Sequence, residues 1–246
     1  MRTFLQDLIS HTHTLGILPI LKLTATETST VIESLSIERE VKLDAVTHFP
    51  VSGLDGVFGM TNLNKLDLHL KCPEYNENAV ITVLTKDYDG EITPVGLNFK
   101  NAYGDFENDY RFINKNIINE KIKKLKSKIE VTYDIEFKPS EANIQRLKFQ
   151  ANAHTEETVF SASVINGDLV FSFGGEESSY AGSFVFQSDI QYKLRNKWSW
   201  PIQHTLNILT LKGDKTMRIS DATGGLQFEV CSGVATYTYF LPAFTK

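Results

Sequence analysis

One order of predicted elements occurs twice along the chain, and this duplication constrains the fold more than any single motif does. Residues 1–112 read as a helix, about three strands, a second helix and about three further strands. Residues 129–246 read the same way after one extra strand, although no residue-level repeat accompanies the order. Short helices with one apolar face must pack against a sheet. We therefore predict an α+β protein built of two similar units, each with antiparallel sheets and two helices.

The four helices are predicted from apolar residues at helical spacing and from start signals. A proline stands near the start of the last two, and Gly213 follows the last one. The second helix contains three glycines, each costing about 1 kcal/mol relative to alanine. The predicted helices cover residues 2–11, 50–64, 140–152 and 201–212.

The predicted strands are runs of alternating or β-branched residues bounded by turn residues. Asn166-Gly167 lies between two apolar runs and is the strongest hairpin signal in the chain, and the turn Tyr88–Glu91 is a second one. The predicted strand regions are 17–27, 29–38, 40–49, 65–72, 78–87, 92–101, 128–138, 157–175, 182–190 and 216–240.

Charge is unevenly distributed, which predicts the domain boundary. The formal net charge is −5. Residues 1–112 hold 9 Lys+Arg and 16 Asp+Glu, residues 113–128 hold 6 Lys and one Glu, and residues 129–246 hold 10 and 13. We predict domain 1 at 1–112, a basic connector at 113–128 and domain 2 at 129–246. The lysine run by itself is also typical of a solvated linker or helix face.

Composition predicts a globular protein of the cytoplasm. Hydrophobic residues make up 41% and charged residues 22% of the chain. The longest apolar run, 15–21, is too short to cross a bilayer, and the first ten residues lack the unbroken apolar core of a signal peptide. Two cysteines indicate no disulfide framework.

Motifs for catalysis are weak. His11 and His13 form a pair without a third ligand at suitable spacing. Gly213–Thr216 lacks the upstream glycine-rich turn of a phosphate loop. The acidic pair in 173–179 is typical of a hairpin tip, and neither cysteine has a partner histidine. We expect no enzyme activity, no catalytic residue, no metal site and no cofactor.

The predicted helices present neutral to basic faces in an otherwise acidic protein. Arg146 and Lys148 belong to the third helix, and His204 and Lys212 to the fourth. Such faces suit phosphate contacts without base readout, and an ordinary mixed surface is the alternative.

Residues 208–243 resemble the end of DNA sliding clamps, especially those of T-even-like tailed phages. A strand, a Gly/Ser turn, a strand of alternating Thr and Tyr and a short Leu-Pro tail follow one another there. Residues 52–68 look like the second helix of the clamp's first domain, and the element order matches over nearly the whole chain. The loops of the first half, particularly 101–120, match nothing in the family.

The resemblance implies a DNA polymerase processivity factor similar to PCNA-type clamps. Three subunits would close head to tail into a ring around duplex DNA and tether a DNA polymerase, after loading by an ATP-dependent clamp loader. In a phage, the ring would act in the cytoplasm of the infected bacterium. No membrane partner is expected.

The resemblance also implies two groups of site residues. The candidates facing DNA are Arg2, Lys65, Arg146, Lys148, His204, Lys212, Lys215 and Arg218. The candidates for a partner-peptide pocket between connector and tail are Phe106, Tyr110, Phe112, Ile113, Tyr239, Leu241, Pro242, Ala243 and Phe244. Core filling is the alternative for these aromatics. A ring- or lattice-forming structural virion protein of β-rich fold is the alternative for the whole chain.

Overall fold

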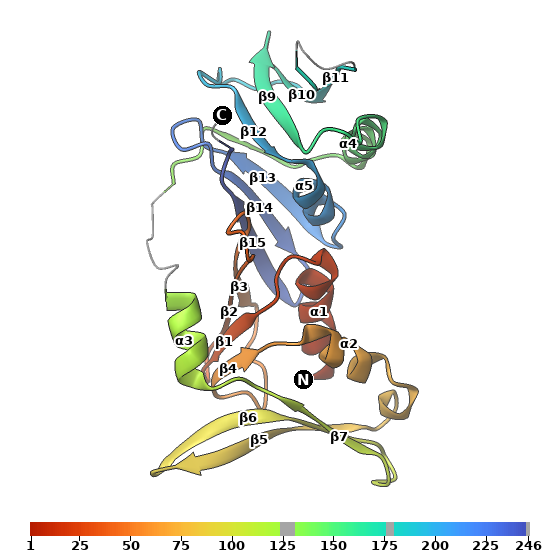
Figure 1. The fold of residues 1–246 in the computed structure, drawn as a ribbon, viewed down its shortest axis with the longest axis vertical. Helices are drawn as coiled ribbons and strands as arrows, with labels where there is room; N and C mark the ends of the chain where they lie inside the picture. The colour runs from red at the N-terminus through yellow and green to blue at the C-terminus, as the bar shows by residue number, and fades with distance from the viewer. Residues whose placement is uncertain (124–130, 176–179, 245–246) are drawn as a thin grey trace. The chain divides into compact units, whose positions relative to one another are not determined.

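The chain divides into two compact units, and one of them takes a segment from the far end of the sequence. Unit 1 is Met1–Lys128 with Ser232–Tyr237, and unit 2 is Ile129–Cys231 with Thr238–Lys246. The computed structural model describes residues 1–123, 131–175 and 180–244 (Figure 1). The strand β15 is shared, because its first three residues belong to unit 1 and the rest to unit 2.

Unit 1 contains two α-helices on a sheet, a second sheet and a helix in the predicted connector. Its elements are α1 (Arg2–His11), η1 (His13–Leu15), β1 (Leu21–Ala25), β2 (Thr30–Leu35), β3 (Lys42–Thr47), β4 (Gly56–Met60), α2 (Leu63–Lys71), η2 (Pro73–Tyr75), β5 (Val80–Tyr88), β6 (Glu91–Lys100), β7 (Glu107–Arg111) and α3 (Lys115–Lys123).

The strands of unit 1 are antiparallel and lie in the orders β4-β1-β2-β3 and β5-β6-β7. The start of β15 follows β3, where His48 N donates to Val234 O at 2.9 Å. The helices α1 and α2 pack together and bury leucines (Figure 1).

A half-buried carboxylate holds this returning segment against α1. Asp7 Oδ2 accepts hydrogen bonds from Ser232 Oγ at 2.9 Å and from the Tyr237 hydroxyl at 2.8 Å. The His11 ring stacks on Tyr237 with centroids 4.5 Å apart, and its Nδ1 lies 3.3 Å from Asp7 Oδ1. Burial by itself would raise the pKa of Asp7, but its hydrogen bonds with His11, Tyr237 and Ser232 outweigh burial and lower it. The charged carboxylate therefore stabilises the docked segment.

Unit 2 repeats the plan after one additional strand. Its elements are β8 (Ile135–Phe137), α4 (Glu141–Ala153), β9 (Val159–Ile165), β10 (Asp168–Phe173), β11 (Gly182–Gln187), β12 (Trp198–Pro201), α5 (Ile202–Leu209), β13 (Asp214–Ile219), β14 (Leu226–Cys231) and β15 (Ala235–Leu241). The antiparallel sheets have the orders β11-β10-β9-β12 and β15-β14-β13-β8.

The predicted duplication is confirmed at the level of strand order. The sheet β4-β1-β2-β3 corresponds to β12-β9-β10-β11, and β5-β6-β7 corresponds to β13-β14-β15. The helix pairs α1/α2 and α4/α5 occupy the same places in the two sequences of elements. Each half has four strands before its second helix rather than the expected three.

Both predicted hairpins are confirmed. Asn166 and Gly167 join β9 to β10 with positive φ angles of 52° and 85°, and Asp89 and Gly90 join β5 to β6 with 54° and 87°. Positive φ at both central residues is typical of the type I′ turn, whose twist matches that of the paired strands. Asn-Gly and Asp-Gly pairs adopt these positive φ angles at little energetic cost.

Two predicted elements of the first half are wrong. Residues 56–60 form the strand β4 rather than part of a helix, because Gly53 and Gly56 have φ angles of 83° and 102°, outside the helical range. Residues 65–71 form part of α2 rather than a strand. There the buried set is Leu63, Leu66 and Leu70, which is a helical spacing.

Candidate nucleic-acid interface and partner pocket

The helix α4 carries the two best-placed candidate cations of unit 2. Its N-cap Ser140 accepts a hydrogen bond from Asn143 N at 3.2 Å, which fixes where the helix begins. Ile144 and Leu147 are buried, whereas Arg146 and Lys148 are exposed. Residues two positions apart do not share a helix face. Arg146 and Lys148 therefore occupy opposite flanks of α4.

A large apolar side chain lies between these flanks. Phe149 is 69% exposed, three positions after Arg146 and on the face away from the core. On the other side, α4 packs against β11, where Asn143 Nδ2 donates to Phe186 O at 2.6 Å. A Cβ on Gly182 would lie 2.7 Å from Gln150 Oε1, so the two elements touch closely. Phe149 thus belongs to a helix that packs against β11, but its own side chain lies on the exposed face of that helix.

The helix α2 shows the same combination in unit 1. Lys65 is exposed, Lys71 pairs with Asp67 at 2.6 Å, and Leu68 between them is 66% exposed. The Tyr110 hydroxyl of β7 donates to Thr61 O just before α2, which ties the start of this helix to the strand. Leu68 is therefore an exposed apolar side chain on the second helix of its unit, and Phe149 is one on the first helix of unit 2.

Arg2 connects α1 to the end of α2 by hydrogen bonds. Its guanidinium donates to Tyr75 O, to Leu70 O at 2.6 Å and to Asn76 Oδ1 at 3.2 Å. Two of these acceptors are carbonyl groups at and just beyond the end of α2, which otherwise need partners. Arg2 therefore joins α1 to α2, and its charge lies at the helix C-terminus.

The remaining cations of unit 2 lie on α5 and beyond it. His204 is half-buried on α5, and Lys212 is exposed after its end. Lys215 Nζ donates to Gly213 O at 3.0 Å, and burial lowers the pKa of its ammonium group. Arg218 pairs with Glu136 at 2.6 Å and Glu229 at 3.0 Å, so two carboxylates already hold its charge.

The predicted connector-side residues separate into two groups. Tyr110 is buried in β7, and burial strongly raises the pKa of its hydroxyl. Phe112 packs edge-on against Phe58 and Tyr110, with centroids 5.3 and 5.9 Å apart. Phe106 lies against the Tyr75 ring at 5.4 Å instead, beyond the other end of β7. The structure brings Tyr110 and Phe112 together in unit 1 and leaves Phe106 apart from them.

The predicted tail residues all lie in unit 2. Tyr239 and Leu241 are buried within β15, Ala243 is half-buried, and Pro242 is exposed. Phe244 is 43% exposed, although its backbone N donates to Ser199 O at 2.9 Å. The tail is thus held by its backbone while an aromatic side chain remains accessible.

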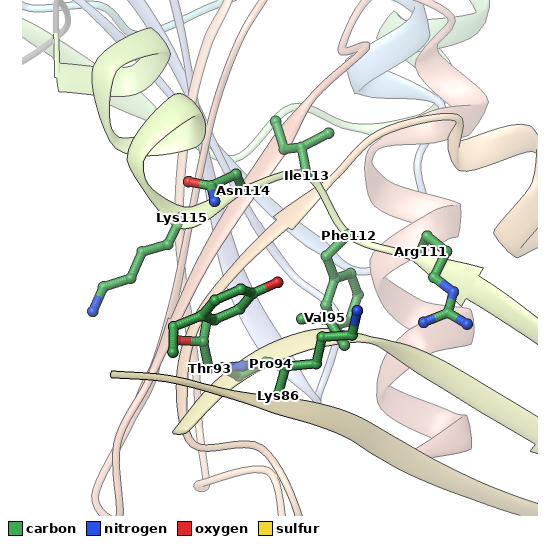
Figure 2. Close-up of a pocket in the computed structure, with 10 residues that line it drawn as sticks. Lys86, Thr93, Pro94, Val95, Arg111, Phe112, Ile113, Asn114 and Lys115 are labelled. Atoms are coloured by element: carbon green, nitrogen blue, oxygen red, sulfur yellow. The ribbon is translucent and has the colours of Figure 1, made fainter. Parts of the chain in front are cut away.

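A cavity of about 300 Å³ lies beside Phe112 and Ile113, within unit 1 (Figure 2). Its walls come from β5, β6, the end of β7 and the start of α3. The lining residues are Lys86, Tyr88, Thr93, Pro94, Val95, Arg111, Phe112, Ile113, Asn114 and Lys115. The sequence reasoning missed its basic rim, although the hairpin prediction at Tyr88–Glu91 already brought β5 and β6 together.

The described residues contain neither a group of side chains that could bind a metal nor a helix that could span a membrane. Within residues 1–123, 131–175 and 180–244, no three His, Cys, Asp or Glu side chains are grouped to hold a metal. In the same ranges, no helix combines the length and apolar character needed to span a membrane.

Comparison with known proteins places the fold. No family model and no curated protein matches the sequence. Among solved structures, the chain is similar to PCNA from Thermococcus kodakaraensis, with a TM-score of 0.62 and 12% sequence identity. The match covers 99% of this chain and 97% of that one. The chain therefore has a PCNA-like α+β fold of antiparallel sheets and helices.

Proposed function

We propose that this protein is a sliding clamp: a non-enzymatic ring that encircles duplex DNA and tethers a DNA polymerase to it. A clamp loader would open and place the ring. The observation that carries the proposal is the PCNA-like fold over 99% of the chain, combined with a duplication that leaves one strand pairing incomplete. The phage origin of the chain stays a prediction.

The incomplete pairing supports assembly with further copies. The start of β15 lies beside β3 in unit 1. In the duplicated plan, β11 of unit 2 corresponds to β3, and β7 of unit 1 corresponds to β15. Within the described residues, β7 and β11 each have one edge that pairs with no other strand. If β7 of one copy pairs with β11 of the next copy, this pair repeats the pairing of β15 with β3 inside one chain. Because the two edges differ, such pairing is head to tail, and it closes a ring when the rotation from one copy to the next completes a circle. We propose three copies.

Exposed apolar side chains on the helices of both units support the same arrangement. Leu68 on α2 and Phe149 on α4 are exposed, and each unit also has an unpaired strand edge, on β7 and β11, within the described residues. Exposed edges invite unwanted pairing unless they are covered, and exposed apolar side chains are typical of surfaces that another protein covers. We propose that Leu68 and Phe149 meet across each boundary between subunits.

The DNA-facing surface of the ring would be the helix pairs. Lys65 on α2 and Arg146 and Lys148 on α4 are exposed cations that can make water-mediated contacts with phosphates. Such contacts carry no sequence information and hold no register, so the ring can slide. Arg2 and Arg218 already engage protein oxygens and are weaker candidates.

Light scattering and a loading assay test the proposal together. A clamp should have three times the 27.8 kDa chain mass. It should also stay on circular DNA after loading and leave when that DNA is linearised, and it should extend the products of its cognate polymerase. A ring that never becomes linked to DNA would instead favour a structural virion protein, and a monomer would contradict both readings.

Charge reversal at Arg146 or at Lys148 tests whether each flank of α4 contributes to DNA residence. We expect Arg146→Glu or Lys148→Glu to shorten residence on open-ended DNA several-fold at about 0.15 M salt, because salt-dependent binding weakens when a cation no longer neutralises a phosphate. The trimer should persist in both variants. Single-molecule residence times measure the effect, and Lys138→Glu is the control, since that exposed lysine lies outside the helices. If neither substitution changes residence, α4 does not face DNA.

A further inference from the structure

The cavity beside Phe112 has an apolar floor held in place by backbone contacts. Pro94, Val95 and Phe112 contribute to this floor, whereas the Ile113 side chain points the other way and packs against Gly59 (Figure 2). Phe112 N donates to Val95 O at 3.0 Å, and Ile113 N donates to Gly59 O at 2.8 Å. The register of β5 with β6 shifts between Leu84 and Thr85, near Pro94 and Val95. A preformed cavity loses little entropy when a ligand binds.

Glycine brings the wall of this cavity close to its support. A Cβ on Gly59 would lie 2.6 Å from the Ile113 side chain and 2.9 Å from Ile118 Cβ, closer than such atoms approach. A Cβ on Gly96 would lie 2.7 Å from Tyr110 O. Both glycines therefore allow the chain from β7 to α3 to pack closely against β4 and β6. This close packing fixes the positions of Phe112 and Ile113.

Three cations from three different elements surround the floor. They are Lys86 of β5, Arg111 of β7 and Lys115 of α3 (Figure 2). Arg111 pairs with Asp109 and Lys115 with Glu91, both at 2.5 Å, and these pairs orient the two side chains. In the part of the chain that the structure describes, Lys86 forms no salt bridge. Its ammonium group is the cation best able to accept a new anionic partner.

Resting on the proposed clamp function, we propose that this cavity docks a partner-protein peptide that carries an apolar side chain next to a carboxylate. The volume of about 300 Å³ suits one or two side chains. The floor would take the apolar group, and Lys86, with the outer N–H groups of Arg111, would take the carboxylate. Glu91 and Asp109 at the rim disfavour a nucleic-acid strand, because its phosphates are closely spaced.

This site shares Phe112 and Ile113 with the predicted partner-peptide pocket but uses none of its tail residues. All ten lining residues belong to unit 1, whereas Leu241–Phe244 belong to unit 2. Lys86, Arg111 and Lys115 are not among the predicted pocket residues, so recognition of a carboxylate by these cations goes beyond what the resemblance implies.

A peptide library can test the site without knowledge of the partner. The probe is a phage-displayed library of random 12-residue peptides selected on the wild-type trimer. We expect enriched peptides to combine Asp or Glu with Leu, Ile, Met or Phe. In fluorescence polarisation, their affinity should fall at least tenfold for Lys86→Glu and less for Lys86→Met, which keeps the apolar stem. Lys138→Glu, the matched charge reversal in unit 2, should bind as wild type does.

Three outcomes would overturn the proposal. Enriched peptides that bind Lys86→Glu normally would place recognition elsewhere, and enrichment without acidic residues would remove the role of the cations. Competition by a 20-nucleotide oligothymidine, lost in Lys86→Glu, would show a nucleic-acid site instead. Failure of peptide binding in a ring that still loads onto DNA would refute this site alone. Peptide binding by a chain that never forms a ring would refute the clamp and leave the site standing.

Discussion

Replacing Phe149 with glutamate should convert the proposed trimer into monomers of 27.8 kDa in size-exclusion light scattering. Phe149 is 69% exposed in the single chain and should become buried against the next copy. Losing a buried phenylalanine costs about 1.5–3 kcal/mol, and burying an unpaired carboxylate adds several more. A loss of about 4 kcal/mol per boundary weakens each contact roughly 1,000-fold.

Three controls make this result specific to the subunit boundary. The monomer should keep its circular dichroism spectrum, because an exposed residue contributes little to the core. Lys148→Glu, the adjacent charge reversal, should leave the trimer intact. Leu68→Lys combined with Phe149→Glu should recover part of the association, because the two new charges attract each other. A Phe149→Glu variant that remains trimeric at micromolar concentration would contradict the proposed boundary.

The largest effect on folding should come from Asp221→Ala in unit 2. The Asp221 carboxylate accepts hydrogen bonds from Arg195 N at 2.9 Å, Asn196 N at 3.3 Å and the Trp198 indole at 3.2 Å, and it also accepts one from the Tyr192 hydroxyl at 3.2 Å. Removing it leaves these donors without a charged acceptor beneath the loop before β12. We expect a loss of about 3–5 kcal/mol in the free energy of unfolding.

This loss should depend on pH in a defined direction. Burial alone would raise the pKa of Asp221, but hydrogen bonds from Arg195, Asn196, Trp198 and Tyr192 outweigh burial and lower the pKa below its usual range. Its contribution is therefore fully present above the unfolded-state pKa of about 3.9 and disappears as pH falls through the lower folded-state value. The difference between wild type and Asp221→Ala should thus shrink below about pH 4.

Urea unfolding followed by tryptophan fluorescence measures this change in unit 2, because both tryptophans, Trp198 and Trp200, belong to that unit. Glu156→Ala removes an exposed carboxylate of the same unit and should change stability by less than about 0.5 kcal/mol. An Asp221→Ala variant as stable as this control at neutral pH would refute the role assigned to the carboxylate.

The sequence predicted the duplication because hairpin turns and proline-led helices are local signals. The Asn166-Gly167 and Asp89-Gly90 pairs determine their turns by their own backbone preferences. The prediction failed where two periods coincide. Leu66, Leu68 and Leu70 alternate as in a strand, yet Leu63, Leu66 and Leu70 also fit one face of a helix, and the structure selects the helix. Leu68, which suggested the strand, is the residue left exposed.

The candidate site depended more on tertiary contacts than on local pattern. The exposure of Arg146 and Lys148 follows from the helical period of α4, so the sequence could suggest it. The engagement of Arg2 by carbonyl groups near residues 70–76 joins positions about 70 residues apart and has no local signal. The basic rim around Lys86, Arg111 and Lys115 likewise combines three elements whose packing only the fold defines.

The returning segment of unit 1 also sets an order of events during protein synthesis. Residues 1–128 leave the ribosome first, but Ser232–Tyr237 emerge roughly 100 residues later. At about 5–20 residues per second, that delay is about 5–20 s. Throughout it, β3 has an open edge, and Asp7 lacks the hydroxyl groups of Ser232 and Tyr237. Unit 1 is therefore synthesised first but completed only after most of unit 2 has been made. During this interval, another chain can pair with the open edge of β3.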